Sequence, residues 1–187
     1  MNEPLSRLQQ RRSVAAHRLG EPGPGAQEVE TLLRVASRVP DHGRLVPWRF
    51  IVLEGAARTR IGDTIAAAFR ADNPDAGAEK TAFERDRLAR APLVIAVVSR
   101  AGPHVKIPEW EQVLSAGAAC MTLLHAAHAL GYGATWITEW YAYDRRVLDA
   151  LGLDPRERIA GFVHVGTVLE APVERVRPDL AAIVTRL

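Results

Sequence analysis

The sequence has little of several features that would define a specialised class of protein. Its single cysteine, Cys120, allows no disulfide within the chain and no cysteine-based metal site. No apolar run is long enough to span a membrane, and residues 1–4 show no basic-then-apolar signal pattern, so we expect a cytoplasmic protein without a membrane partner. The net charge is only +2, and the basic residues are spread along the chain. Nucleic acid is therefore not an expected partner.

Signatures of several enzyme classes are also missing. The chain has neither the Gly-x-Ser-x-Gly elbow of a serine hydrolase nor the P-loop of a nucleotide triphosphatase. His125 and His128 are three positions apart in an apolar stretch, but no third histidine or suitably spaced acidic residue accompanies them. We interpret them as buried or interface histidines and predict no metal site. Cys120 is interpreted as a small core residue and not as a nucleophile.

The composition is that of one globular domain, which we expect to span residues 1–187. Hydrophobic residues make up 48% of the chain and charged residues 25%. Apolar periodicity predicts helices over residues 4–10, 26–38, 56–71, 79–90, 109–130 and 144–151. Apolar runs predict strands over residues 50–53, 92–98, 134–138 and 159–165. Strands separated by helices are typical of a layered α+β or α/β domain.

The helix predicted over residues 109–130 is apolar around most of its circumference after Gln112. A helix of this kind is usually buried at the centre of a fold or at a subunit interface. Because a small domain with one thin sheet has little surface to cover it, this helix favours a homodimer.

Four short motifs indicate where a ligand could bind. Residues 10–13, Gln-Arg-Arg-Ser, place two guanidinium groups beside a hydroxyl, and such donors can grip a phosphate. Residues 39–48, Val-Pro-Asp-His-Gly-Arg-Leu-Val-Pro-Trp, form a turn-rich loop that leads into a strand. Residues 131–138, Gly-Tyr-Gly-Ala-Thr-Trp-Ile-Thr, lead from a helix into a strand, whereas a Rossmann turn leads from a strand into a helix. Residues 175–178 read Arg-Val-Arg-Pro.

Each motif is weak alone, but in this order and spacing the four resemble the nitroreductase family of flavin enzymes. Residues 39–48 and 106–112 look like its short subgroup, in which Pro-Asp-His replaces the Pro-Ser-x pattern. The resemblance implies an α+β three-layer sandwich, with a central mixed sheet flanked by helices. It also implies an FMN-dependent oxidoreductase that passes hydride from NAD(P)H to a nitroaromatic or quinone-like acceptor in a ping-pong cycle. The implied assembly is a homodimer with FMN sites at the subunit interface.

The resemblance also implies which residues bind the cofactor, while the flavin itself carries the chemistry. Arg11–Ser13 and the tail residue Arg177 would hold the FMN phosphate. The segment Trp136–Thr138 would run along the flavin, and the loop His42–Arg44 would serve the flavin of the partner chain. The candidate cofactor-binding residues are Arg11, Arg12, Ser13, Arg38, His42, Arg44, Trp136, Ile137, Thr138 and Arg177.

The chain departs from the family pattern at three positions. Arg44 and Val46 stand where longer enzymes have Asn and Gln, and Ala15 stands where many have a basic residue. The positive charge usually aimed at the flavin N1–O2 edge must then come from elsewhere. The candidates are Arg12, Arg38 and Arg44.

Two other readings of the motifs remain. One is a non-catalytic flavin- or ligand-binding module on the same fold, with Tyr132 and Trp136 lining a pocket. The other is a specialised family member, such as a dehalogenase or a flavin-degrading enzyme, which needs extra lid residues between the strands at Phe50 and Leu93. That region is short and charged here, with Phe83 as its last aromatic residue. No motif distinguishes NADH from NADPH.

Overall fold

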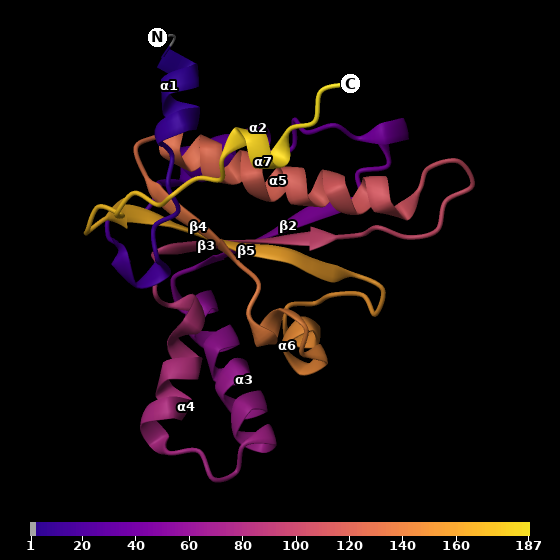
Figure 1. Cartoon of the computed structure of the whole chain (residues 1–187). Coiled ribbons are helices and arrows are strands. Elements are labelled where there is room, and N and C mark those ends of the chain that lie inside the picture. Colours follow the sequence, from indigo (N-terminus) through magenta and orange to yellow (C-terminus); the bar gives the residue numbers. More distant parts are fainter. Residues whose placement is uncertain (1–2) are drawn as a thin grey trace.

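The centre of the fold is one five-stranded sheet, described over residues 3–187 by a computed structural model (Figure 1). The strands are β1 (Leu19–Gly20), β2 (Trp48–Glu54), β3 (Leu93–Ser99), β4 (Gly133–Ile137) and β5 (Arg158–Val168). β5 pairs with β1, β3 and β4, and β3 also pairs with β2. All these pairings are antiparallel, so the parallel pairing that a mixed sheet needs is not found within residues 3–187.

Helices connect most of these strands. The α-helices are α1 (Glu3–Gln10), α2 (Ala26–Ala36), α3 (Ala56–Asp72), α4 (Ala78–Arg85), α5 (Glu109–Ala129), α6 (Arg145–Ala150) and α7 (Leu180–Ile183). Short 3-10 turns are η1 (Ala16–Arg18), η2 (His42–Arg44), η3 (Asp86–Leu88) and η4 (Trp140–Ala142).

The sheet is covered on both faces, and β3 shows this most clearly. All seven of its residues are buried, as its continuous apolar sequence predicts for a strand between two layers. Ile95 and Val97 point into a core shared with α2 and α5, whereas Val94 and Ala96 point into a core shared with α3 and α6. Figure 1 shows α2 and α5 on one side of the sheet and α3, α4 and α6 on the other. The expected three-layer α+β sandwich is confirmed.

The long central helix α5 is buried along one side and exposes apolar side chains near its first turns. Cys120 on the buried side is a core residue, as expected, and burial raises its pKa to about 12. On the other side, Trp110 and Leu114 are 68% and 54% exposed. Burying such a patch would require a further surface that residues 3–187 do not provide.

Several boundaries differ from the sequence predictions. The helix expected over residues 79–90 ends at Arg85 and continues as the 3-10 turn η3. At that point α4 packs directly on α3, because a Cβ on Gly62 would lie 2.2 Å from the Arg85 carbonyl oxygen. β5 is longer than expected, and β1 and α7 were not predicted. Short elements of this kind depend on their tertiary contacts and leave little periodicity in the sequence.

The described residues were compared with two further structural patterns, a membrane-spanning helix and a metal-binding group. Among the described residues, no helix combines the length and apolar character needed to cross a membrane. Residues 3–187 also bring together no group of three or more His, Cys, Asp or Glu side chains that could hold a metal ion.

Candidate functional site

Arg11, directly after α1, carries a partly buried guanidinium that forms no ion pair with another described residue. Its Nε and Nη1 atoms are buried and find no hydrogen-bond partner within the described chain. Burial lowers the pKa of Arg11, and the charges of Arg177 and Arg12 lower it further. Buried donors are nearly always satisfied in native proteins, so these two donor nitrogens of one guanidinium are open to a ligand. An anion would satisfy them best.

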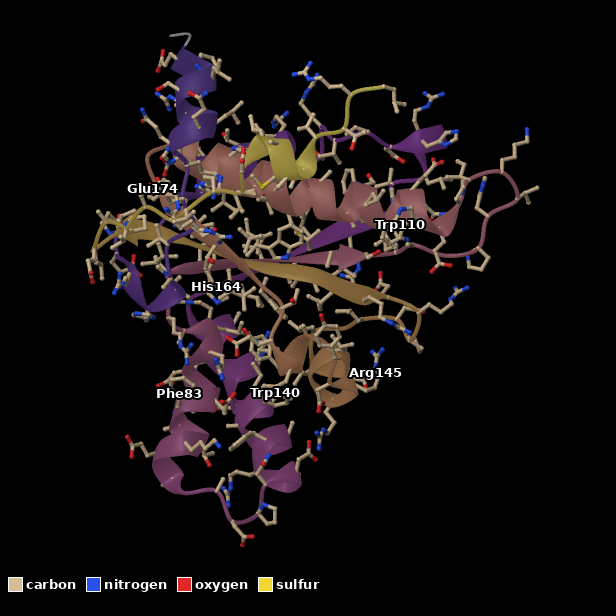
Figure 2. The ribbon with its side chains drawn as sticks, viewed as in Figure 1. Phe83, Trp110, Trp140, Arg145, His164 and Glu174 are labelled. Carbon is tan, nitrogen blue, oxygen red and sulfur yellow. The ribbon has the colours of Figure 1, made fainter. Side chains whose placement is uncertain are left out.

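The C-terminal tail reaches this site through Glu174, which lies near the end of α1 (Figure 2). Arg12 Nη1 donates to Glu174 Oε1 over 2.6 Å, and Arg177 Nη2 lies 3.4 Å from the same oxygen. One carboxylate thus gathers two of the three arginines and leaves Arg11 without a partner. The structure therefore brings Arg177 to Arg11 and Arg12, although more than 160 residues separate them in sequence.

The last turns of α5 form another wall of this site. His125 and His128 are half-buried there, and burial lowers the pKa of both. Arg11 is the next cause of both shifts, which places its charge close to the two rings. The histidines therefore lie beside the arginine cluster, which consists of Arg11, Arg12 and Arg177.

The Arg11–Ser13 segment continues along the edge of β4. Val14 N donates to Ala134 O over 3.1 Å, and Ser13 itself is exposed. Gly133 permits this close packing, since a Cβ there would lie 2.6 Å from Val168 and 2.7 Å from Leu19. Strand β4 thus connects the arginine cluster to the next candidate residues, Trp136–Thr138.

Trp136 presents part of an indole ring beside this strand. It is 39% exposed, and its Nε1 donates to Ala160 O on β5 over 2.9 Å. Ile137 is half-buried and Thr138 is exposed. These three residues therefore form a partly open surface at the end of the strand whose Ala134 contacts Val14.

The loop with His42 is held in an unusual backbone conformation. Arg44 and Val46 have positive φ angles of 56° and 49°. Non-glycine residues in this region cost about 1–3 kcal/mol each and persist only where their surroundings enforce them. Asp41 supplies that support, because its two carboxylate oxygens accept hydrogen bonds from Leu45 N and Val46 N, each over 2.9 Å. The loop is therefore preorganised.

The first turns of α5 anchor the same loop. Trp48 Nε1 donates to Ser115 Oγ over 3.1 Å, and Ser115 Oγ donates to Pro40 O over 2.6 Å. His42 Nδ1 lies 2.7 Å from Glu111 Oε2. The motif of residues 39–48 thus fixes a rigid loop that presents His42 and Arg44 at the surface.

Within one chain, the loop and the arginine cluster lie at opposite ends of α5. The loop is anchored at Glu111, whereas Arg11 lies beside His125. At 1.5 Å per residue, the 14 positions between Glu111 and His125 correspond to roughly 21 Å. Figure 2 shows Trp110 and Glu174 toward the two ends of the helix. The structure therefore does not bring His42 and Arg44 to Arg11–Ser13 of the same chain.

The candidate cations for the flavin N1–O2 edge differ in whether they already form an ion pair. Arg12 is bound to Glu174, whereas Arg38 and Arg44 are exposed and form no ion pair with another described residue. Sequence reasoning missed Asp41, Ser115 and Glu174 as parts of the site. Asp41 had a recognisable signal, since Asp often stabilises a turn through its backbone N–H groups. Glu174 had none.

Comparisons with known proteins place the chain in a family. The model of the nitroreductase family matches residues 8–167. The Escherichia coli K12 protein YdjA, provisionally named an NAD(P)H nitroreductase, is 37% identical over 184 residues, 97% of each chain. A Haemophilus influenzae protein with a similar provisional name is 36% identical over 154 residues, 82% of this chain and 83% of that one.

Solved structures agree with this assignment. A nitroreductase-like protein from Bacillus cereus superimposes with a TM-score of 0.87 at 21% identity, covering 100% of this chain and 97% of that one. A Desulfovibrio desulfuricans protein, described as a nitroreductase in complex with FMN, gives a TM-score of 0.76 at 26% identity, covering 100% and 98%. The first of these shows the same fold, and the sequence matches show common descent. The chain belongs to the nitroreductase family.

Proposed function

We propose that this chain is an FMN-dependent NAD(P)H oxidoreductase that acts as a homodimer. The observation that carries the proposal is the partly buried guanidinium of Arg11. Its Nε and Nη1 find no hydrogen-bond partner within residues 3–187, and two further cations, Arg12 and Arg177, lie beside it. A terminal phosphate fits this donor set, because guanidinium forks bind phosphate bidentately. FMN ends in such a phosphate, and the Desulfovibrio desulfuricans relative is described in complex with FMN.

In this proposal each group of residues has its own task. Arg11 and Ser13 hold the phosphate, and Arg177 adds charge from the tail. Trp136, Ile137 and Thr138 line the surface along which the flavin extends. Bound FMN would take a hydride from NAD(P)H and pass reducing equivalents to a nitroaromatic or quinone-like acceptor in a ping-pong cycle.

The chain itself supplies positive charge and a fixed loop. Reduction of a flavin builds negative charge at its N1–O2 edge, and preorganised cations stabilise such charge. Arg38 and Arg44 are exposed and form no ion pair within residues 3–187, so either can serve. Because Asp41 holds the backbone around Arg44, that guanidinium is presented from a rigid base. Solvent can supply the protons, so no residue is assigned as a catalytic acid.

Two observations favour a dimer with shared sites. The His42 loop lies roughly 21 Å along α5 from the arginine cluster, so within one chain it does not reach a phosphate bound at that cluster. Near that loop, Trp110, Val113 and Leu114 form an exposed apolar patch on α5. Such patches mark interaction surfaces. A second copy that covers this patch can place its His42 and Arg44 beside the flavin of the first.

The test uses the purified protein. We expect a yellow protein that releases FMN on denaturation in a ratio near one per chain. NADH or NADPH should bleach the flavin absorbance, and a quinone should restore it. A flavin that binds but is not reduced by either nucleotide would indicate a binding module instead. A colourless protein that takes up no added FMN would refute the proposal.

A further inference from the structure

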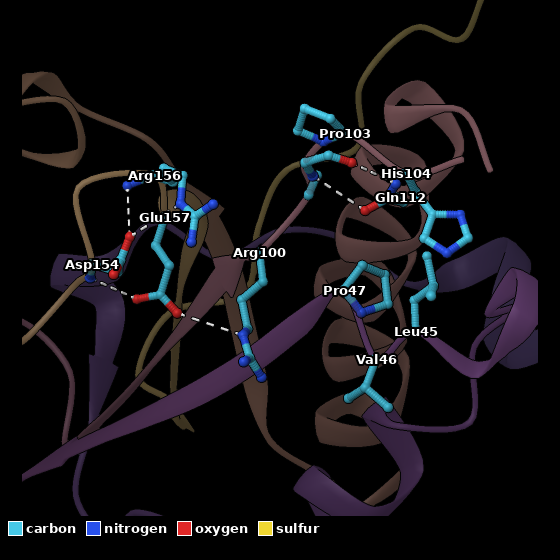
Figure 3. Close-up of a pocket in the computed structure, with 12 residues that line it drawn as sticks. Leu45, Val46, Pro47, Arg100, Pro103, His104, Gln112, Asp154, Arg156 and Glu157 are labelled. Atoms are coloured by element: carbon cyan, nitrogen blue, oxygen red, sulfur yellow. Dashed lines mark hydrogen bonds and ion pairs between the residues drawn. The ribbon is translucent and has the colours of Figure 1, made fainter. Parts of the chain in front are cut away.

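A second recess lies beside the His42 loop, away from the arginine cluster. It is a cavity of about 400 Å3, within the range of small-molecule sites. Its walls come from the loop before β2, the segment after β3 and the turn before β5. Figure 3 shows Arg100 between Val46 and Pro47 on one side and Arg156 and Glu157 on the other. The cavity therefore has an apolar wall and a charged wall.

The segment after β3 is held in place and offers hydrogen-bond donors. The buried Gln112 side chain donates from Nε2 to Gly102 O over 2.9 Å and accepts from Gly102 N over 3.2 Å. His104 Nδ1 accepts from Lys106 N and Ile107 N over 3.2 and 3.1 Å. A ring nitrogen that accepts carries no proton, so the proton of the neutral ring sits on Nε2. His104, which is among the residues that line the cavity, therefore has Nε2 as its donor nitrogen.

Arg100 retains free donors although a carboxylate is near. Glu157 is bound by Arg49, from Nε over 2.8 Å and from Nη2 over 2.7 Å. Glu157 also accepts from Asp154 N over 2.9 Å, and these contacts, with the hydrogen bond from Arg49 first, lower its pKa to about 2. Arg100 Nε lies 3.7 Å from Glu157 Oε1, which is too long for a hydrogen bond. The half-exposed Arg100 guanidinium can therefore bind another anion.

The other charges at the cavity do not cancel this one. Arg156 is 90% exposed, and its Nε lies 3.7 Å from Asp154 Oδ1. Among the residues that line the cavity, Arg100 and Arg156 face two carboxylates, Asp154 and Glu157. Arg49, outside the lining, already neutralises Glu157 through two hydrogen bonds, so Glu157 competes only weakly for Arg100.

We propose that this cavity binds the carboxylate of a small aromatic acid. Arg100 holds the carboxylate, because a guanidinium fork matches its two oxygens. Leu45, Val46 and Pro47 pack against the ring, and His104 lines the same cavity. This deepens and rests on the proposed function: because the cavity adjoins the loop assigned to the flavin, acceptors that carry a carboxylate would be preferred over neutral ones.

The first test is binding to the FMN-loaded protein without turnover. Titration calorimetry compares benzoate with its neutral analogue benzamide. We expect benzoate to bind at least ~10-fold more tightly than benzamide, a difference in binding free energy of about 1.4 kcal/mol. Arg100→Gln should abolish this difference, and Arg100→Lys should keep part of it. The control is Arg60→Gln, at an exposed position on α3, which should behave as the parent does.

The second test is turnover with matched acceptors, 4-nitrobenzoate and 4-nitrobenzamide. Arg100→Gln should raise the KM for nitrobenzoate ~10-fold or more and leave the KM for nitrobenzamide unchanged. Equal binding of benzoate and benzamide by the parent would overturn the inference, as would an Arg100→Gln variant of unchanged melting temperature that keeps the preference. A raised KM for NADPH alone would overturn it in favour of a site for the nucleotide phosphate.

The two proposals fail in different ways. If the proposed function is wrong, no acceptor is reduced, including a neutral quinone. If only the cavity assignment is wrong, the quinone is reduced normally and the carboxylate preference is missing.

Discussion

Trp136 occupies the space that a side chain on Gly161 would need. A Cβ at Gly161 would lie 1.9 Å from Trp136 Nε1 and 2.2 Å from its Cδ1. On the opposite side of the indole, a Cβ at Gly117 on α5 would lie 3.7 Å from Trp136 Cη2, an ordinary contact. The indole ring therefore packs on β5 because Gly161 has no side chain, and its Nε1 donates a hydrogen bond to Ala160 O. The same ring borders the proposed flavin surface.

Gly161→Ala should displace Trp136 and thereby weaken FMN binding. The added methyl overlaps the indole, and such overpacking typically costs about 1–3 kcal/mol. We expect a shifted tryptophan emission in the FMN-free protein and an FMN dissociation constant raised several-fold. Gly117→Ala is the matched control, because its Cβ only touches the ring, and it should change neither quantity much. Unchanged emission and affinity in Gly161→Ala would show that Trp136 does not depend on this contact.

Arg11→Ala should have opposite effects on cofactor binding and on the stability of the FMN-free protein. Loss of the phosphate contact should weaken FMN binding by about 1.5–3 kcal/mol, the usual contribution of a hydrogen bond to a charged group. The FMN-free variant should be at least as stable as the parent, since a buried cation without a partner has been removed. Fluorescence titration and urea unfolding measure the two effects. Arg177→Ala should weaken binding less, and parental affinity in Arg11→Ala would place the phosphate elsewhere.

A mixed dimer tests whether the sites are shared between chains. One subunit carries Arg11→Ala and the other His42→Ala, and two affinity tags isolate the heterodimer. If each site uses Arg11 of one chain and His42 of the other, one site carries both lesions and the other none. Activity should then be about half that of the parent. Activity near that of the single variants would mean that each chain builds its own site.

The same assembly predicts a large interface. An obligate dimer that covers the patch on α5 should bury more than roughly 2,000 Å2. Sedimentation at micromolar concentration should therefore show a dimer. A monomer under these conditions would contradict the shared-site arrangement.

His164 should make the protein less stable in mild acid. Its side chain is fully buried on β5, Nδ1 has no partner within the described chain, and burial lowers its pKa to about 4. Below pH 6.5, the ordinary pKa of histidine, His164 is protonated in the unfolded chain but stays neutral in the folded protein until about pH 4. The contribution of His164 to stability should therefore fall between pH 6.5 and 4, by up to about 1.4 kcal/mol per pH unit, and stay constant below pH 4.

Urea unfolding at fixed protein and FMN concentrations measures this slope. His164→Gln removes the titrating group while keeping an amide that can donate to Arg87 O, as His164 Nε2 does over 3.3 Å. This variant should lose the slope between pH 6.5 and 4. His17→Gln, at an exposed position, should retain it. An unchanged slope in His164→Gln would assign the acid sensitivity to other groups.

Local patterns in the sequence were sufficient for the layered fold and the family. The run of residues 92–98 predicted a strand covered on both faces, and β3 is one, because continuous apolar sequence is a direct record of two-sided burial. The apolar helix of residues 109–130 corresponds to α5, since 3.6-residue periodicity is likewise local. The four motifs predicted the nitroreductase family, and the comparisons confirm it. The individual cofactor residues remain predictions.

Contacts between distant segments were decided by the tertiary structure. Glu174 meets Arg12 across 162 positions, and Arg49 meets Glu157 across 108. Trp136 depends on a glycine one strand away. No periodicity or motif predicts such pairs. The energy of an ion pair or a steric fit depends on distance in space and not on distance in sequence. The separation of the His42 loop from the arginine cluster is also of this kind, because the length and position of α5 set it.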